Sequence, residues 1–166
     1  MSNPEYFETV DKNDRVIGRA LRSQCHSNPK LIHRGVFVIV INLKGEILLQ
    51  KRSKNKDLYP GVWDIYVGGH NKPGDTYKKA AQREMREELG LKTSLNSIGK
   101  IFLKYKNKET EFDMIFETKI RDQKINFNKK EIEKVKFLTV KEIKKINKDE
   151  LAPKVLKVLN FYQKHK

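Results

Sequence analysis

An uninterrupted apolar run at residues 35–42 constrains the fold more than any other feature of this sequence. A strand with one solvated face alternates apolar and polar residues, whereas a strand that is apolar throughout needs cover on both faces. The run therefore predicts a central strand between two packed layers. It is also far too short to span a membrane. The 166 residues suit one domain, 1–166, which is long enough to bury a core without disulfides.

Other segments supply the strands and helices that such a centre needs. Turn-forming residues at 11–14 separate two expected strands, and the full set of expected strands beside the central one is 6–10, 15–21, 46–50, 63–67, 98–105, 112–120 and 133–138. A helix is expected at 77–89, capped by Asp75 or Thr76 and ended by Gly90. A capping box at 139–142 predicts a short helix. An apolar stripe predicts a final helix that includes Leu151, Val155, Val158, Leu159 and Tyr162. The expected class is α/β (α+β), a mixed β-sheet with helices packed on it.

The net charge of +15 favours anionic partners without identifying one. Of the 36 basic residues, 28 are Lys and 8 are Arg, and Ile and Asn are abundant, a pattern that compositional bias alone also produces. The one cysteine, Cys25, excludes an internal disulfide, and the first residues show no secretory signal. We therefore expect a cytoplasmic protein without membrane attachment, as a monomer or a homodimer.

Three glutamates share one face of the expected helix at 77–89. Glu84, Glu87 and Glu88 have the spacing i, i+3, i+4, which brings them onto one turn. Carboxylates this close repel one another, and hard oxygen ligands at this spacing suit Mg²⁺ or Mn²⁺. Arg83 lies four residues before Glu87 and is placed to orient the cluster. Taken alone, the same pattern also describes a solvated acidic face.

The residues that flank this cluster decide between the two interpretations. Residues 69–91, GHNKPGDTYKKAAQREMREELGL, resemble the Nudix box, G-x5-E-x7-R-E-U-x-E-E-x-G-U, where U is a bulky aliphatic residue. Gly69 fills the first position, and the matches that follow in register are Arg83, Glu84, Met85, Glu87, Glu88, Gly90 and Leu91. The one departure is Asp75, where the box has Glu. The resemblance implies a Nudix fold, a mixed β-sheet sandwiched between helices.

The resemblance also implies a chemistry. Nudix hydrolases cleave a diphosphate linkage, here expected in a nucleoside di- or triphosphate or a related small phosphorylated metabolite. The implied metal ligands are Glu84, Glu87, Glu88 and the backbone carbonyl of Gly68, and the metal polarises the water that attacks phosphorus. The catalytic candidates are Glu84, Arg83, Glu87 and Glu111, and the identity of the general base stays open.

Residues outside the box resemble one branch of this superfamily, type 1 isopentenyl diphosphate isomerase. His26 and His33 stand in HSNPKLIHRG, His70 in GGH, and Glu109 and Glu111 in ETE, where alternation puts both carboxylates on one face of a strand. In the isomerase the five corresponding residues hold one metal. Here they either bind a second divalent metal or persist as inherited geometry.

The same resemblance suggests substrate contacts. Arg22 and Arg52 fall where the isomerase family binds diphosphate, and Tyr105 falls near its active-site tyrosine. The complete set of substrate-binding candidates is Arg22, Lys51, Arg52, Lys56, Trp63 and Tyr105.

Two departures separate this sequence from the isomerase. The position of the isomerase's acid–base cysteine is Gly68, which has no proton to transfer, and the three box glutamates are all present. We therefore expect an isomerase-like Nudix hydrolase, with isopentenyl diphosphate isomerase as the alternative. A further alternative is an RNA-directed Nudix protein that uses the basic residues of 119–166. No RNA-binding motif with interleaved aromatic residues is apparent, so a small-molecule diphosphate is the expected partner and nucleic acid the disfavoured one.

Overall fold

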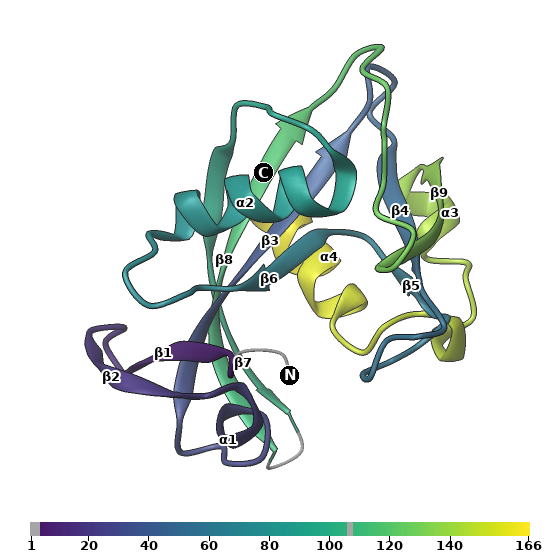
Figure 1. The fold of residues 1–166 in the computed structure, drawn as a ribbon. Helices are drawn as coiled ribbons and strands as arrows, with labels where there is room; N and C mark the ends of the chain where they lie inside the picture. Colours follow the sequence, from purple (N-terminus) through teal and green to yellow (C-terminus); the bar gives the residue numbers. More distant parts are fainter. Residues whose placement is uncertain (1–3, 106–107) are drawn as a thin grey trace.

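The structure, a computed structural model, describes residues 4–105 and 108–166. Its centre is β3 (Ile32–Ile41), which contains the apolar run except for its last residue, Asn42 (Figure 1). One edge of β3 pairs in parallel with β8 (Glu109–Lys119) along the whole length of β3. Its other edge pairs in succession with β1 (Tyr6–Val10), β6 (Val67–His70) and β4 (Ile47–Arg52). The middle of the sheet is therefore one long strand pair with three shorter neighbours.

The remaining strands extend this centre into one connected sheet of nine strands among the described residues. They pair at its margins: β2 (Val16–Leu21) with β1, β7 (Asn96–Tyr105) with β8, and both β5 (Trp63–Asp64) and β9 (Ile132–Leu138) with β4. The β1–β2 hairpin stands apart from the two large helices, at the purple end of the chain in Figure 1.

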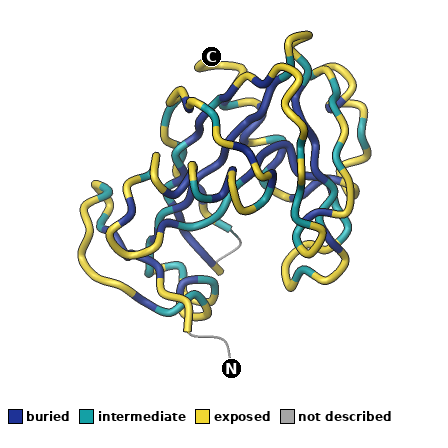
Figure 2. The backbone as a smooth tube through the Cα atoms, turned by 45° about the horizontal axis from the view of Figure 1, so that its top comes forward, coloured by how far each residue is buried: buried dark blue, intermediate teal, exposed yellow. Residues whose placement is uncertain are grey.

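Both faces of β3 are covered, as its sequence predicts. The even-numbered residues of 36–40 pack in the core beneath α2 (Tyr77–Leu89), and the odd-numbered residues of 37–41 pack in the core beneath α4 (Val155–His165). Figure 1 shows α2 in front of the sheet and α4 behind it, and Figure 2 shows the central strands buried under exposed loops. The expected α+β class, with a mixed sheet between helices, is confirmed.

Helix α2 begins and ends where the sequence predicts. Of the two candidate caps, Thr76 is the one that acts, because its side chain accepts a hydrogen bond from the Lys79 backbone N–H at 3.1 Å. Gly90 ends the helix in the left-handed region, at φ 67°. No helix in the described ranges has the length and apolar character needed to cross a membrane.

Two predictions about local structure are wrong. Residues 63–67 do not form one strand: β5 pairs with β4, the chain then turns through the buried Ile65 and Tyr66, and β6 pairs with β3. Leu151 lies before α4 instead of on it, because a bridge to Trp63 holds it in extended conformation. The short elements are α1 (Arg22–Cys25), which was not predicted, the predicted α3 (Val140–Ile143) and a 3-10 turn at Lys148–Glu150.

Candidate active site

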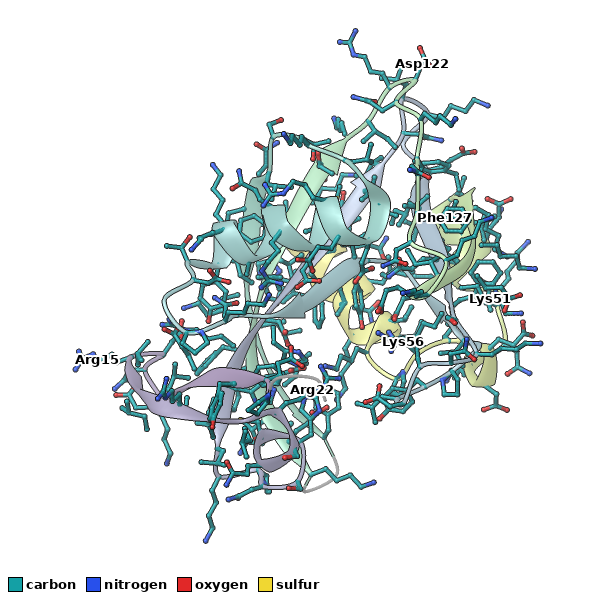
Figure 3. The ribbon with its side chains drawn as sticks, viewed as in Figure 1. Arg15, Arg22, Lys51, Lys56, Asp122 and Phe127 are labelled. Carbon is teal, nitrogen blue, oxygen red and sulfur yellow. The ribbon has the colours of Figure 1, made fainter. Side chains whose placement is uncertain are left out.

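A cavity of about 360 Å³ brings most of the predicted site residues together. They come from β6, α2 and β8, from α1 and the residue that follows it, and from β4 and the loop after it. Those that line the cavity are Arg22, His26, Arg52, Lys56, Gly68, His70, Arg83, Glu84, Glu87, Glu88, Glu109 and Glu111. Figure 3 shows Arg22 and Lys56 reaching toward this central region from different segments. His33 is fully buried beside the cavity.

Three of the substrate-binding candidates, Lys51, Trp63 and Tyr105, do not line the cavity. Lys51 and Trp63 are direct partners in the β4–β5 register, and they share the face of that pair that points away from the cavity. Lys51 lies on the outer side of the molecule in Figure 3, 3.8 Å from Glu133. The Trp63 ring is 7% exposed and lies under the Lys136 ammonium, whose Nζ is 4.1 Å from the ring centre. The structure therefore does not bring these two residues together with the other candidates.

The glutamate face of α2 lies directly against β6. Glu84 is 9% exposed, and a Cβ at Gly69 would stand only 2.5 Å from its carboxylate. Glycine at the first position of the box is thus what allows this carboxylate to reach the cavity. Glu87 is more exposed, at the cavity rim, and Glu88 lies beside the Gln50 side chain.

Arg83 ties this helix face to the preceding loop. Its Nη2 donates to the backbone oxygen of His70 at 2.9 Å and to Oδ2 of Asp75 at 3.2 Å, and its Nη1 donates to Glu84. Asp75 also accepts the Lys72 backbone N–H at 3.3 Å. Asp75 therefore joins loop and helix even though the box pattern has the longer Glu at its position.

The electrostatics of this face favour a bound cation. Burial, together with the charge of Glu84, raises the pKa of Glu88 to about 8. Burial also raises the pKa of Glu84, even though Arg83 opposes the shift. Buried carboxylates in this state gain from a divalent ion that displaces their protons. The donor set, all carboxylate oxygen, fits a hard cation such as Mg²⁺ or Mn²⁺.

A second cluster joins the three predicted histidines to the two glutamates of β8. His33 and Glu111 are register partners in the β3–β8 pair, and His33 Nε2 lies 3.3 Å from Glu111 Oε2. His70 Nε2 lies 3.7 Å from the same oxygen and 3.4 Å from His26 Nε2. His26 Nε2 in turn lies 3.5 Å from Glu109 Oε2. Residues far apart in sequence thus bring three imidazoles together, with one carboxylate beside His26 and another beside His33 and His70.

Two of the three histidines are in the neutral state that a metal requires. Burial lowers the pKa of His26 to about 4 and that of His70 to about 3, so both are neutral near pH 7. His33 Nδ1 faces the Leu31 carbonyl oxygen at 3.4 Å, which leaves its Nε2 as the atom that faces the cluster. That buried Nε2 lies against Glu111 Oε2. The three ligand nitrogens lie within 4.8 Å of one another, so the set fits a divalent cation.

Lys154, which directly precedes α4, is a member of this cavity that the sequence interpretation missed. Its ammonium donates to Glu111 Oε1, the oxygen that faces away from the histidines, and lies 4.5 Å from the ring centre of Tyr105. Burial opposes the charge of Lys154, but Glu111 and Asp113 keep its pKa raised. Burial likewise opposes the charge of Glu111, and Lys154, His33 and His70 hold the pKa of that carboxyl well below its usual value. The cluster therefore contains a cation of its own.

Comparison with known folds agrees with this architecture. The family description "NUDIX domain" matches residues 31–159, which include the glutamate face of α2. The crystal structure of DR0079 from Deinococcus radiodurans superposes on this chain with a TM-score of 0.79 at 24% sequence identity. The superposition covers 94% of this chain and 98% of the DR0079 chain. At this identity the likeness shows a shared fold.

Sequence relatives carry two kinds of name. An uncharacterized Nudix hydrolase from Nostoc is 32% identical over 157 residues, covering 92% of this chain and 91% of that protein. Another, from Pseudomonas aeruginosa, is 37% identical over 102 residues, which is 61% of this chain and 60% of that protein. An isopentenyl-diphosphate Delta-isomerase from Photorhabdus laumondii is 29% identical over 141 residues, 81% of this chain and 79% of that protein. The chain belongs to the Nudix hydrolase family.

Proposed function

We propose that this protein is a divalent-metal-dependent hydrolase that cleaves a diphosphate linkage in a nucleoside di- or triphosphate or a related small phosphorylated metabolite. The observation that carries the proposal is the glutamate face of α2 at the cavity, where burial raises the pKa values of both Glu84 and Glu88. A face of this kind gains from a divalent cation, and it opens into a cavity that also holds basic side chains.

The residues that would hold the ion are Glu84, Glu87, Glu88 and the backbone carbonyl of Gly68. When bound there, such an ion would supply charge neutralisation for a diphosphate and polarisation of a water. Arg83 keeps Glu84 in place through the contacts described above, so the helix face is organised before any ligand arrives.

Cations at the cavity rim are placed to receive phosphate oxygens. Arg22 Nη1 lies 3.3 Å from Glu5 Oε2, and its Nη2 lies 3.8 Å from Asp57 Oδ2. The Lys56 ammonium forms an ion pair with Glu131. These partly exposed ion pairs are weak, so the cations can turn from their carboxylates to a more highly charged diphosphate.

Arg52, which the sequence also suggested as a phosphate contact, uses its guanidinium for hydrogen bonds within the protein. It donates to Asp64 Oδ2 at 3.1 Å and to the backbone oxygens of Tyr59 and Leu58 at 3.0 and 2.9 Å. We assign it the role of holding the loop after β4 against the cavity wall.

We assign the general base to Glu84 in preference to Glu111. A raised pKa makes the Glu84 carboxylate the stronger proton acceptor of the two. Glu111 is a poor acceptor because Lys154, His33 and His70 stabilise its charged form.

The isomerase stays the second candidate because the five-residue cluster of His26, His33, His70, Glu109 and Glu111 is assembled. Two features oppose it. A Cβ at Gly68 would collide with the Val36 carbonyl and stand 2.9 Å from the Phe37 ring, so a cysteine does not fit there without a backbone shift. Protonation of an alkene carbon also creates a carbocation, which the Lys154 ammonium would repel. Incubation with isopentenyl diphosphate in D₂O tests this alternative, and we expect no deuterium in the prenyl group.

The test of the proposed hydrolase is a phosphate-release screen with Mg²⁺ and with Mn²⁺. The panel contains nucleoside di- and triphosphates, nucleotide sugars, dinucleoside polyphosphates, NADH, ADP-ribose, CoA and prenyl diphosphates. Products that already end in a phosphomonoester are treated with phosphatase before phosphate is measured. We expect selective hydrolysis of one class, abolished by EDTA. Silence across the panel from folded, metal-loaded protein contradicts the proposal.

A further inference from the structure

Two buried side chains on the cavity wall present hydrogen-bond acceptors toward the cavity. Gln50 on β4 and Asp64 on β5 are direct register partners, so their side chains point to the same face. They are 5% and 1% exposed, and both line the cavity. Gln50 Oε1 and Asp64 Oδ1 have no hydrogen-bond partner among the described residues.

The orientation of both acceptors is fixed by their neighbours. Gln50 Nε2 donates to the Tyr66 backbone oxygen at 2.7 Å, so the amide cannot be reversed without placing oxygen against oxygen. Arg52 holds Asp64 through Oδ2, so Oδ1 is turned away from the guanidinium. The Tyr66 hydroxyl is the other polar group beside this carboxylate, and it also lines the cavity. Buried acceptors are almost always paired in folded proteins. Two such oxygens on the same face of one strand pair, at a cavity wall, therefore indicate a ligand group that donates hydrogen bonds.

An apolar rim lies next to these acceptors. Tyr59 and Leu58 line the same cavity and are 45% and 39% exposed. Tyr59 has φ 50°, a conformation that is strained for a bulky residue. Arg52 maintains it by binding the backbone oxygens of both rim residues. The same guanidinium thus fixes one acceptor and the aromatic rim.

We propose that Gln50, Asp64, Tyr59 and Leu58 form a subsite for the base of a nucleotide, in which the two acceptor oxygens bind an exocyclic amino group and the rim packs on the ring. The inference rests on the proposed function, because it places the phosphates of the same ligand at the glutamate face of α2. Gln50 is itself a neighbour of Glu88, so the two sites adjoin. A base with a carbonyl group in place of the amine would direct a third oxygen at two acceptors.

The matched ligands for testing this subsite are CMP and UMP, whose bases carry an amino group and a carbonyl group at the same position. Neither has a diphosphate to cleave, so calorimetric binding in Mg²⁺ buffer reports the subsite independently of turnover. We expect CMP to bind at least about tenfold more tightly than UMP, because a site of acceptors discriminates strongly against a ligand that lacks the donor. AMP and IMP form a second pair with the same chemical difference.

Three variants test which side chains are responsible for the preference for CMP over UMP. Asp64→Asn offers an N–H where the protein had only oxygen, so the CMP preference should fall below about threefold. Asp149→Asn, the same change at an exposed site, should leave the preference intact. Gln50→Met removes the other acceptor without touching the Arg52 contact, and it should also lower the preference, which keeps the test available if Asp64→Asn does not fold.

The outcomes separate this inference from the proposed hydrolase. Equal binding of CMP and UMP overturns the subsite, as does discrimination that follows only the ribose 2′-hydroxyl when dCMP is compared with CMP. Clear amino-group discrimination in a protein that hydrolyses nothing in the phosphate-release screen supports the subsite and contradicts the hydrolase. Hydrolysis of nucleotides without discrimination between amino and carbonyl bases supports the hydrolase and contradicts the subsite.

Discussion

The glutamate face of α2 and the His/Glu cluster on β3, β6 and β8 line one cavity but balance their charge in opposite ways. At the glutamate face, burial and mutual repulsion raise the pKa values of Glu84 and Glu88. In the His/Glu cluster, the Lys154 ammonium and the imidazoles hold the pKa of Glu111 well below its usual value. Burial also keeps His26 and His70 neutral.

This difference supports the proposal that the glutamate face, and not the His/Glu cluster, holds the catalytic ion. The His/Glu cluster contains a cation supplied by the chain, so its buried carboxylate is stable as the protein folds. The glutamate face has more negative charge than Arg83 neutralises, and it is the better place for an external divalent cation. We therefore assign the catalytic metal to α2 and treat the histidines as a separate site with different metal preferences.

The largest effect is expected from removing the charge of the glutamate face. The double substitution Glu84→Gln and Glu88→Gln should lower turnover by about three orders of magnitude, because it removes ligands of the ion that stabilises the transition state. Phosphate release measures the loss, and circular dichroism checks that the fold is intact. Glu150→Gln, at an exposed position, is the matched control. If the double variant turns over substrate at the wild-type rate, the glutamate face of α2 is not the catalytic centre.

The next effect concerns the cation of the His/Glu cluster. Lys154→Met leaves Glu111 buried without its ammonium partner, and we expect the free energy of unfolding to fall by about 3–5 kcal/mol. Chemical denaturation in EDTA measures it. Lys157→Met changes an exposed lysine on α4 and should be close to neutral. If Lys154→Met is as stable as the wild type, the internal cation does not stabilise the cluster.

A pH titration compares the two centres directly. The Glu88 carboxyl, with a pKa of about 8, holds a proton at lower pH in the metal-free protein, and a bound ion must displace it. Mg²⁺ affinity should therefore fall about tenfold per pH unit from pH 8 toward pH 6.

The histidine site should behave differently over the same range. His26 and His70 have pKa values of about 4 and about 3, so they stay neutral between pH 6 and pH 8. Zn²⁺ affinity measured in the Glu84→Gln, Glu88→Gln variant should be nearly constant there. Calorimetry in two buffers counts the protons released, and Mg²⁺ binding that releases none at pH 7 contradicts the assignment for Glu88.

The smallest effect is expected at the one departure from the box. Asp75→Glu restores the residue of the family pattern while keeping the carboxylate that Arg83 and the Lys72 N–H bind. We expect kcat/KM to change by no more than about threefold, because the charge-assisted contacts persist. A tenfold change in either direction would show that the loop geometry depends on the shorter side chain.

Local patterns in the sequence were sufficient to predict much of this structure. The apolar run predicted a strand covered on both faces, and the caps of α2 were visible because Thr76 and Gly90 act on their own helix. Alternation also placed Glu109 and Glu111 on one face of β8, where both face the histidines.

The features that were missed depend on contacts between distant segments. Lys154 is one lysine among 28, and its partner Glu111 lies 43 residues away, so no local pattern marks it. Lys51 and Trp63 looked like substrate contacts, but the β4–β5 register turns them away from the cavity and turns Gln50 and Asp64 toward it. The break in residues 63–67 likewise follows from two different strand partners, β4 and β3.

The central claim is that water, activated at the glutamate face, attacks phosphorus. Turnover of a substrate found in the phosphate-release screen, carried out in H₂¹⁸O with Mg²⁺, tests it most directly. We predict one ¹⁸O atom in the phosphate products for each bond cleaved, and no labelled product above background from the Glu84→Gln, Glu88→Gln variant. Products that carry no ¹⁸O, or label that appears equally with the variant, would contradict the account.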